Sequence, residues 1–200
     1  MADRSEVLDV TVQVAAVLEQ LDIPYLVGGS LASSLHGIPR ATQDVDLVAM
    51  LAPAHAQLLV SALEQDFYID LDMIQSAIRR RSSFNLIHLQ TLFKVDVFVH
   101  QPDVLGQEQM KRRQRYTLEG SPGRSLVVAS PEDVILQKLR WYQMGNRVSE
   151  RQWRDVLGVF RVCRAVLDVE YLQRVARQAE LGDLLGEALE AAENEQEVRL

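Results

Sequence analysis

Two aspartates separated by one residue lie inside an apolar run and are the first candidates for chemistry. The alternation in Asp44-Val45-Asp46-Leu47 predicts a β-strand, in which residues two positions apart point to the same face. We therefore expect the side chains of Asp44 and Asp46 to lie together. Neighbouring carboxylates repel each other unless a cation lies between them, and a hard divalent cation such as Mg²⁺ prefers oxygen ligands. An exposed, solvated sheet face is the alternative interpretation.

A Gly-Gly-Ser turn comes before this strand, at the end of another apolar run. Gly28, Gly29 and Ser30 follow Tyr25-Leu26-Val27, and a helix-length segment comes after them. Backbone N–H groups at the start of a helix favour bound anions. We therefore expect this turn to hold phosphate groups, although a simple helix cap would also explain Ser30.

A third acid, Asp96, lies in the apolar run 93–99. Burying a carboxylate among apolar residues without compensation is costly, so this acid is more informative than one on a polar surface. The run 84–89 and the run 93–99 are joined by a three-residue link, which predicts an antiparallel hairpin. This hairpin would place Asp96 on a strand beside the one that carries Asp44 and Asp46.

The order of these motifs resembles the polymerase-β-type nucleotidyltransferase superfamily, in which Gly-Ser is followed by Asp-x-Asp and then by a carboxylate on a later strand. The residues that match this order are Gly29-Ser30, Asp44, Asp46 and Asp96. The connecting piece adds Ala32, His36-Gly37 and Arg40-Ala41-Thr42. In the second half, Glu132-Asp133 with Lys138, followed by Arg154-Asp155, resembles the AbiEii-like toxin nucleotidyltransferases and their minimal relatives.

This resemblance implies transfer of a nucleoside monophosphate from a nucleoside triphosphate to a hydroxyl group, with release of pyrophosphate. Its catalytic and metal-binding residues would be Asp44, Asp46 and Asp96, holding two Mg²⁺ ions, with Mn²⁺ as the alternative ion. Two ions can bind both the attacking and the leaving oxygen. The nucleotide would be bound by Gly28, Gly29, Ser30, Arg40, Lys138 and Asp155. A solvated position for Lys138, and an ion pair of Asp155 with Arg151 or Arg154, are the structural alternatives.

The acceptor is left open by the sequence. The toxin-like resemblance implies an RNA end or a protein side chain, together with a toxin–antitoxin or defence setting and a small antitoxin-like partner. A small molecule such as an aminoglycoside is a further option. The competing hypothesis is a non-catalytic module that binds a nucleotide or a partner protein. The basic runs 79–81 and 111–115 suit either a solvated surface or a phosphate backbone.

The periodicity of the chain predicts an α/β (α+β) fold with a small mixed sheet flanked by helices and a C-terminal helical annex. We expect a catalytic core over residues 1–123, with the last strand and the helical region over 124–200. Expected helices include 4–20, 31–35, 72–80, 169–180 and 182–193, with two more that begin after Ser130 and Ser149. Expected strands are 25–27, 43–50, 84–89, 93–99 and 126–129. Gly37 is expected to end its helix in a left-handed conformation.

Composition limits the class of protein. The chain has 200 residues, 48% hydrophobic and 24% charged, which is enough to bury a core without a disulfide or a metal. A single cysteine favours a reducing, cytoplasmic location. The polar start predicts no signal peptide, and the absence of an 18-residue apolar run predicts no membrane contact. The net charge of −7 argues against a protein that coats nucleic acid generally.

Overall fold

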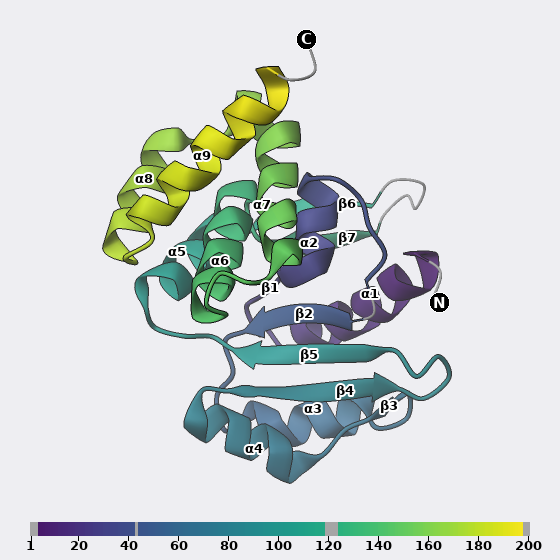
Figure 1. Cartoon of the computed structure of the whole chain (residues 1–200). Coiled ribbons are helices and arrows are strands. Elements are labelled where there is room, and N and C mark those ends of the chain that lie inside the picture. Colours follow the sequence, from purple (N-terminus) through teal and green to yellow (C-terminus); the bar gives the residue numbers. More distant parts are fainter. Residues whose placement is uncertain (1–3, 43, 119–123, 198–200) are drawn as a thin grey trace. The chain divides into compact units, whose positions relative to one another are not determined.

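The computed structural model describes residues 4–42, 44–118 and 124–197. Within these residues, helices accompany a seven-stranded mixed sheet with the order β3-β4-β5-β2-β1-β7-β6 (Figure 1). The predicted α/β fold class is confirmed. In the same part of the chain, no helix is both long enough and apolar enough to cross a lipid bilayer.

The chain divides into two compact units whose segments alternate along the sequence. Unit 1 consists of Met1–Gly28, Ala41–Gln101 and Arg113–Val128. Unit 2 consists of Gly29–Arg40, Pro102–Arg112 and Ala129–Leu200. The predicted division into 1–123 and 124–200 stays a prediction, and its boundary adjoins residues 119–123, which lie outside the described part.

Unit 1 contains the whole sheet. Its strands are β1 (Tyr25–Val27), β2 (Asp44–Ala49), β3 (Phe67–Tyr68), β4 (Ser83–His88), β5 (Lys94–Val99), β6 (Gln114–Thr117) and β7 (Ser125–Val128). Its helices are α1 (Arg4–Gln20), α3 (His55–Leu63) and α4 (Leu71–Arg80). Strand β2 covers residues 44–49 of the expected strand 43–50; Met50 follows the strand, and residue 43 lies outside the described part. The short strands β3 and β6 were not predicted.

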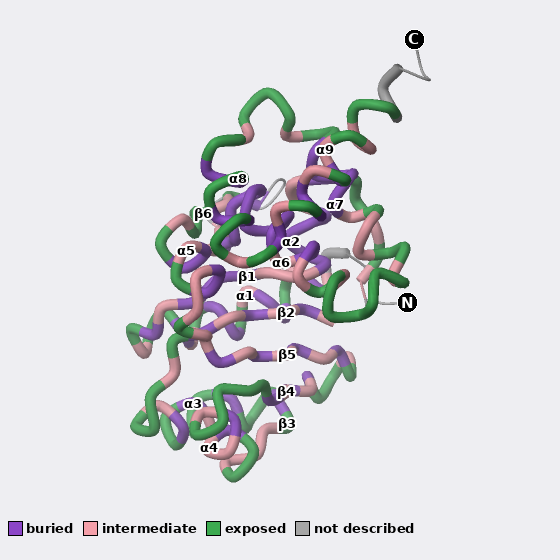
Figure 2. Tube along the Cα trace, turned by 60° about the vertical axis from the view of Figure 1, so that its left-hand side comes forward, coloured by how far each residue is buried: buried purple, intermediate pink, exposed green. Residues whose placement is uncertain are grey.

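Strands β2 and β5 alternate strictly between buried and half-buried residues (Figure 2). Val45 and Leu47 of β2, and Val95 and Val97 of β5, are at most 2% exposed. Because successive strand residues point to opposite faces, burying these side chains forces the intervening residues onto the other face. Helix α1 packs on β2, and α4 packs on β4 and β5.

Unit 2 is helical. It contains α2 (Gly29–His36), α5 (Val104–Arg112), α6 (Pro131–Met144), α7 (Glu150–Cys163), the 3₁₀ turn η1 (Arg164–Val166), α8 (Val169–Gln178) and α9 (Gly182–Glu197). As predicted, Ser130 and Ser149 cap α6 and α7, since their hydroxyls accept hydrogen bonds from the amides of Asp133 and Gln152. Helix α2 packs on α6 and α7, and α9 also packs on α7.

The expectation for Gly37 is wrong. Among the described glycines only Gly29 has a positive φ, of 53°, so Gly37 does not end its helix in a left-handed conformation. Close packing explains it instead, because a Cβ on Gly37 would lie 2.8 Å from the Ser33 carbonyl oxygen and 3.0 Å from backbone atoms of Gly158 and Val159. Helix α2 also begins earlier than expected, at Gly29, so Ser30 belongs to its first turn.

We expect Gly37→Ala to lower the free energy of unfolding by about 1–3 kcal/mol, because the new methyl group would press on backbone atoms of α7 that cannot rotate away. The matched control is Gly186→Ala in the middle of α9, where an added Cβ has no neighbour within 4 Å. That variant should gain about 0.5–1 kcal/mol from helix propensity. Urea unfolding of both variants measures the difference, and equal effects would contradict the packing explanation.

Candidate functional site

The predicted acids lie on two adjacent strands of unit 1. Strand β2 pairs with β5 in parallel, and the register places Asp46 opposite Asp96 and Asp44 opposite Lys94. Residues directly opposite each other on neighbouring strands share a face. The three carboxylates therefore occupy one face, away from the buried valines and leucines of the same strands. The predicted β4–β5 antiparallel hairpin is confirmed, whereas the catalytic and metal-binding roles of the acids stay predictions.

A lysine lies among these acids. The ammonium Nζ of Lys94 is 2.7 Å from the Asp96 carboxylate. The hydrogen bond to Asp96 raises the pKa of Lys94, and the negative charges of Asp44 and Asp46 act in the same direction. Lys94 was not predicted as a site residue. Its position two residues before Asp96 on the same strand could have indicated that the two side chains share a face.

The donor types fit a hard divalent cation, because three carboxylates on one sheet face supply only oxygen ligands. Within residues 4–42, 44–118 and 124–197, however, no three His, Cys, Asp or Glu side chains already stand in an arrangement that would hold a metal ion. Asp96 is engaged with Lys94 instead. Binding of an ion by all three acids therefore requires Asp96 to give up that ion pair.

The two glycines of the turn have different requirements. The Gly28 amide donates a 2.9 Å hydrogen bond to the carbonyl oxygen of Asp46, which continues the pairing of β1 with β2. A Cβ on Gly28 would meet its nearest neighbour, a Leu26 methyl carbon, only at 3.8 Å. Gly29 has a φ of 53°, which residues with a side chain rarely adopt. Glycine is thus required by backbone conformation at Gly29 only.

In unit 2, Ser30, Arg40, Lys138 and Asp155 form one network. The Asp155 carboxylate accepts two hydrogen bonds from Arg40, each of 2.9 Å, and one of 2.7 Å from Lys138. Arg40 also donates a 2.6 Å hydrogen bond to the Ser30 hydroxyl. The side chains of Lys138 and Asp155 are only 5% and 8% exposed. The structure thus brings together these predicted nucleotide-binding residues, whose binding role stays a prediction.

Asp155 is the shared counter-charge of this network. Burial alone would raise the pKa of Asp155, but the hydrogen bonds from Arg40 and Lys138 outweigh burial and hold this pKa below its ordinary value. Asp155 is therefore a carboxylate at neutral pH. It faces the cations of both Arg40 and Lys138, and it ties α6 and α7 to the segment that follows α2.

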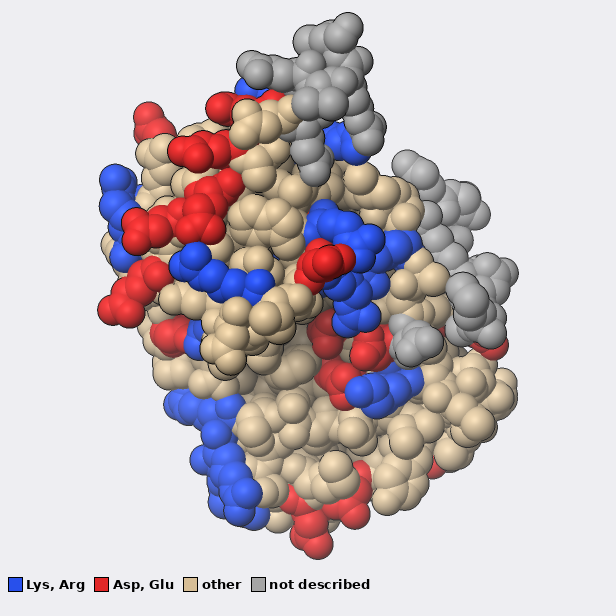
Figure 3. Space-filling view, in the orientation of Figure 1, with Lys and Arg blue, Asp and Glu red and all other residues tan. Residues whose placement is uncertain are grey.

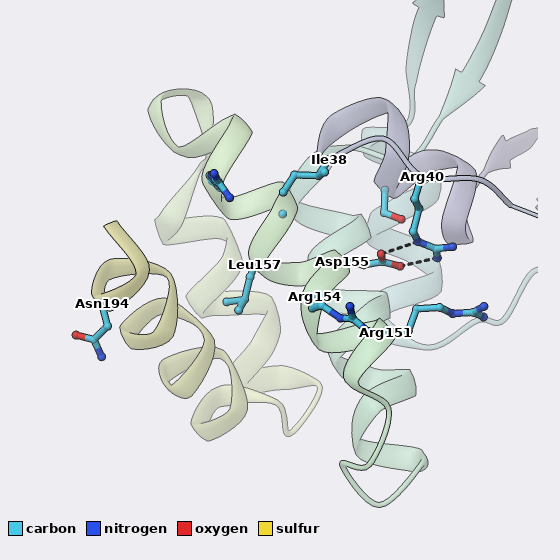
Figure 4. A pocket seen from close by; sticks show the side chains of 10 residues that line it. Ile38, Arg40, Arg151, Arg154, Asp155, Leu157 and Asn194 are labelled. Atoms are coloured by element: carbon cyan, nitrogen blue, oxygen red, sulfur yellow. Dashed lines mark hydrogen bonds and ion pairs between the residues drawn. The ribbon is translucent and has the colours of Figure 1, made fainter. Parts of the chain in front are cut away.

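A cavity of about 780 Å³ opens beside this network within unit 2 (Figure 4). The paired side chains of Arg40 and Asp155 lie at its wall (Figure 4). Its other lining residues are Ser33, Ile38, Arg151, Arg154, Leu157, Gly158, Arg161 and Asn194. From the sequence, Arg151 and Arg154 were expected as ion-pair partners of Asp155, not as lining residues. Arg161 was not predicted, although its spacing of seven residues from Arg154 on one helix could have indicated it.

We expect Asp155→Asn to lower the free energy of unfolding at pH 7 by about 3 kcal/mol, because Lys138 would lose its buried counter-charge. A depressed carboxyl pKa stabilises the folded state above the ordinary value of 3.8, and this stabilisation is lost as pH falls through the lower folded pKa. The difference between wild type and variant should therefore hold from pH 7 to about 5 and shrink below 3.8.

The measurement for Asp155 is urea unfolding across this pH range. The control is Arg154→Gln, whose ion pair with Glu150 spans 3.8 Å between side chains 75% and 88% exposed. Such a pair contributes little, so the control should stay within about 0.5 kcal/mol of wild type. A wild-type advantage over Asp155→Asn that grows on acidification would contradict the assigned charge state.

We expect Lys94→Gln to increase the stabilisation by Mg²⁺. Without the ammonium, Asp96 loses its contact with Lys94, and a bound cation then relieves more of the repulsion among the carboxylates. Thermal unfolding with and without millimolar Mg²⁺ should show a larger upward shift in Tm for the variant than for wild type. Lys111→Gln, which removes the charge of another lysine that pairs with a carboxylate elsewhere on the surface, is the control. An identical Mg²⁺ shift in all three proteins would argue against an ion site at these acids.

No protein-family model matches the sequence, and a search of curated proteins gives no match. Solved structures do match over most of the chain. An antigenic nucleotidyltransferase-like protein from Paracoccidioides brasiliensis is 22% identical, with a TM-score of 0.57 and coverage of 94% of both chains. The antibiotic-resistance factor ANT(2'')-Ia is 14% identical, with a TM-score of 0.52 and coverage of 95% of this chain and 96% of that one.

A third structure, the lincosamide antibiotic adenylyltransferase LnuA with bound lincomycin, is 13% identical, with a TM-score of 0.52 and coverage of 80% of this chain and 98% of that one. At these identities the likeness concerns the fold. The architecture that the acids and the Gly-Gly-Ser turn predict is thus the one observed: the chain has a nucleotidyltransferase-like α/β fold.

Proposed function

We propose that this chain is a metal-dependent nucleotidyltransferase that moves a nucleoside monophosphate from a nucleoside triphosphate to a hydroxyl acceptor. The observation that carries the proposal is the register of β2 and β5, which sets Asp46 opposite Asp96 with Asp44 on the same face. A nucleotidyltransferase-like fold supports it. In the reaction the acceptor oxygen bonds to the α-phosphorus, the bond from that phosphorus to the bridging oxygen breaks, and pyrophosphate leaves.

The acids would hold Mg²⁺ or Mn²⁺. Bound ions at such a site supply positive charge to the attacking and leaving oxygens. Asp96 has a second role in the proposal, as the acceptor of the proton that the hydroxyl loses. A carboxylate that receives a proton must be free of its ion pair, so Lys94 has to move off Asp96 during the cycle. Lys94 then retains its charge and can offset the carboxylates that remain.

In this proposal the triphosphate is bound by residues that the resemblance to nucleotidyltransferases implies. The Gly29 amide, the Ser30 hydroxyl and the Arg40 guanidinium offer donors of the kinds that bind phosphate oxygens. Asp155 is itself an anion and repels phosphate, so it is a positioning residue that orients Arg40 and Lys138. Lys138 is 5% exposed and acts through its charge.

The biological setting and the antitoxin-like partner stay predictions from the resemblance, and the cytoplasmic location stays a prediction from the single cysteine. The non-catalytic alternative shares every binding feature with the enzyme and differs only in turnover. Clustered carboxylates favour the enzyme, because a scaffold that merely binds a nucleotide gains nothing from three adjacent negative charges. Binding of a triphosphate without release of pyrophosphate, with any acceptor, would favour the alternative.

The test is transfer of label from α-³²P nucleotides in the presence of Mg²⁺ or Mn²⁺, with total RNA, lysate protein or an aminoglycoside as acceptor. We expect Asp46→Asn and Asp96→Asn each to lower the transfer rate by more than about 100-fold, as when a group that stabilises charge in the transition state is removed. Asp72→Asn, at an exposed position in the first turn of α4, is the control and should keep the wild-type rate. Transfer that persists in Asp44→Asn/Asp46→Asn would remove the mechanism.

A further inference from the structure

Helix α7 carries arginines along one face. Arg151, Arg154 and Arg161 are spaced by three and seven residues, which are separations that bring side chains to the same side of a helix. The stripe is about 15 Å long at 1.5 Å per residue. All three side chains line the 780 Å³ cavity. Arg40 lines it too, and Figure 4 shows it with Arg151 and Arg154.

This positive charge is little neutralised. Arg154 faces Glu150 at 3.8 Å across two highly exposed side chains, an arrangement that solvent screens. Among the side chains that the structure describes, which end at Asn194 in α9, no carboxylate forms an ion pair with Arg151 or Arg161. The chain as a whole has a net charge of −7, whereas the arginine stripe on α7 is positively charged. Figure 3 shows Lys and Arg atoms in several groups on the face in view, with Asp and Glu atoms beside some of them.

The shape of the cavity also suits a ligand. Gly158 lies between Arg154 and Arg161 in the lining, and its lack of a side chain lets Ile38 pack there, within 3.5–3.7 Å of where a Cβ would lie. Leu157 and Ile38 give the lining an apolar part, and Ser33 and Asn194 add neutral polar groups. A volume of about 780 Å³ is within the range of small-molecule and cofactor sites.

Guanidinium groups bind phosphates through paired N–H donors. A single phosphate could reach only part of a stripe about 15 Å long, whereas a chain of linked phosphates can follow it. A polycationic acceptor such as an aminoglycoside would be repelled by the same arginines. The chemistry of this cavity therefore favours a ligand with several phosphates in a row.

We propose that this cavity binds the sugar-phosphate backbone of a single nucleic-acid strand, which supplies the acceptor hydroxyl. The role of the strand as the acceptor rests on the proposed function, whereas the binding of the strand does not. It narrows the acceptor classes left open by the sequence to a strand of nucleic acid. Whether that strand is RNA or DNA is decided by the arms of the experiment, because both present the same phosphates.

The experiment measures fluorescence anisotropy of a labelled 12-nucleotide strand, as RNA and as DNA, without triphosphate or divalent metal and at 50–200 mM salt. We expect Arg151→Gln/Arg161→Gln to weaken binding about 10-fold or more and to reduce the slope of log K against log salt by about 0.7 for each lost phosphate contact. Arg151→Lys/Arg161→Lys keeps the charges and should keep most of the slope.

The matched control is Arg79→Gln/Arg80→Gln, which removes the same charge from the exposed last turn of α4 in unit 1. A loss as large in this control would show general charge attraction and overturn the proposal, as would wild-type protein that binds neither strand. ATP alone, titrated into the complex, tests a further rival. Displacement of the strand, together with loss of ATP binding in the Arg151→Gln/Arg161→Gln variant, would make the cavity a mononucleotide site.

These outcomes are separate from those of the transfer assay. If strand binding depends on the arginines but Asp44→Asn/Asp46→Asn leaves label transfer unchanged, the proposed function fails and the strand site stands. If transfer requires the acids but strand binding ignores the arginines, the further inference fails and the proposed function stands. Thermal unfolding of the arginine variants is the control for folding. We expect all of them to be folded, because all the replaced side chains are exposed.

Discussion

The fold of unit 1 has to overcome the repulsion among the carboxylates on one face of its sheet. Asp46 and Asp96 face each other in register, so no other placement on these strands would bring their charges closer. The same alternation that buries Val45, Leu47, Val95 and Val97 sends the acids to this face. A slip of one residue in β5 would drive Asp96 into the apolar packing, where an unpaired carboxylate is costly. Core burial thus holds the acids together against their repulsion.

A cation is then needed, and the chain supplies one. Lys94 uses the same register, since it lies opposite Asp44 and two residues before Asp96. Its ammonium carries one positive charge and contacts the Asp96 carboxylate. A divalent ion would bring two positive charges to the same face. The proposed metal-dependent chemistry would use the carboxylates that this register gathers.

Much of this arrangement was predictable because it follows from local periodicity. The strands around Asp44 and Asp96 alternate strictly, and Ser130 and Ser149 begin helices with side-chain caps, so both kinds of signal lie within a few residues. Gly37 was misinterpreted because its requirement comes from backbone atoms of Gly158 and Val159, more than a hundred positions away in the sequence. The hydrogen bonds between Arg40 and Asp155 also join positions more than a hundred residues apart. The sequence could therefore indicate each residue as a candidate but could not predict that the two form a pair.

The network of Arg40, Lys138 and Asp155 in unit 2 is better explained by a functional role than by a contribution to stability. A buried ion pair contributes little net stability, because the cost of removing charges from water offsets their attraction. The cluster of Arg40, Lys138 and Asp155 places two cations around one carboxylate, and an anion that binds beside it would interact favourably with both cations. The arginines on α7 extend the positive charge away from this cluster along the same cavity. The net charge of −7 therefore says little about partners, because unit 1 concentrates negative charge at its acids while unit 2 concentrates positive charge at its cavity.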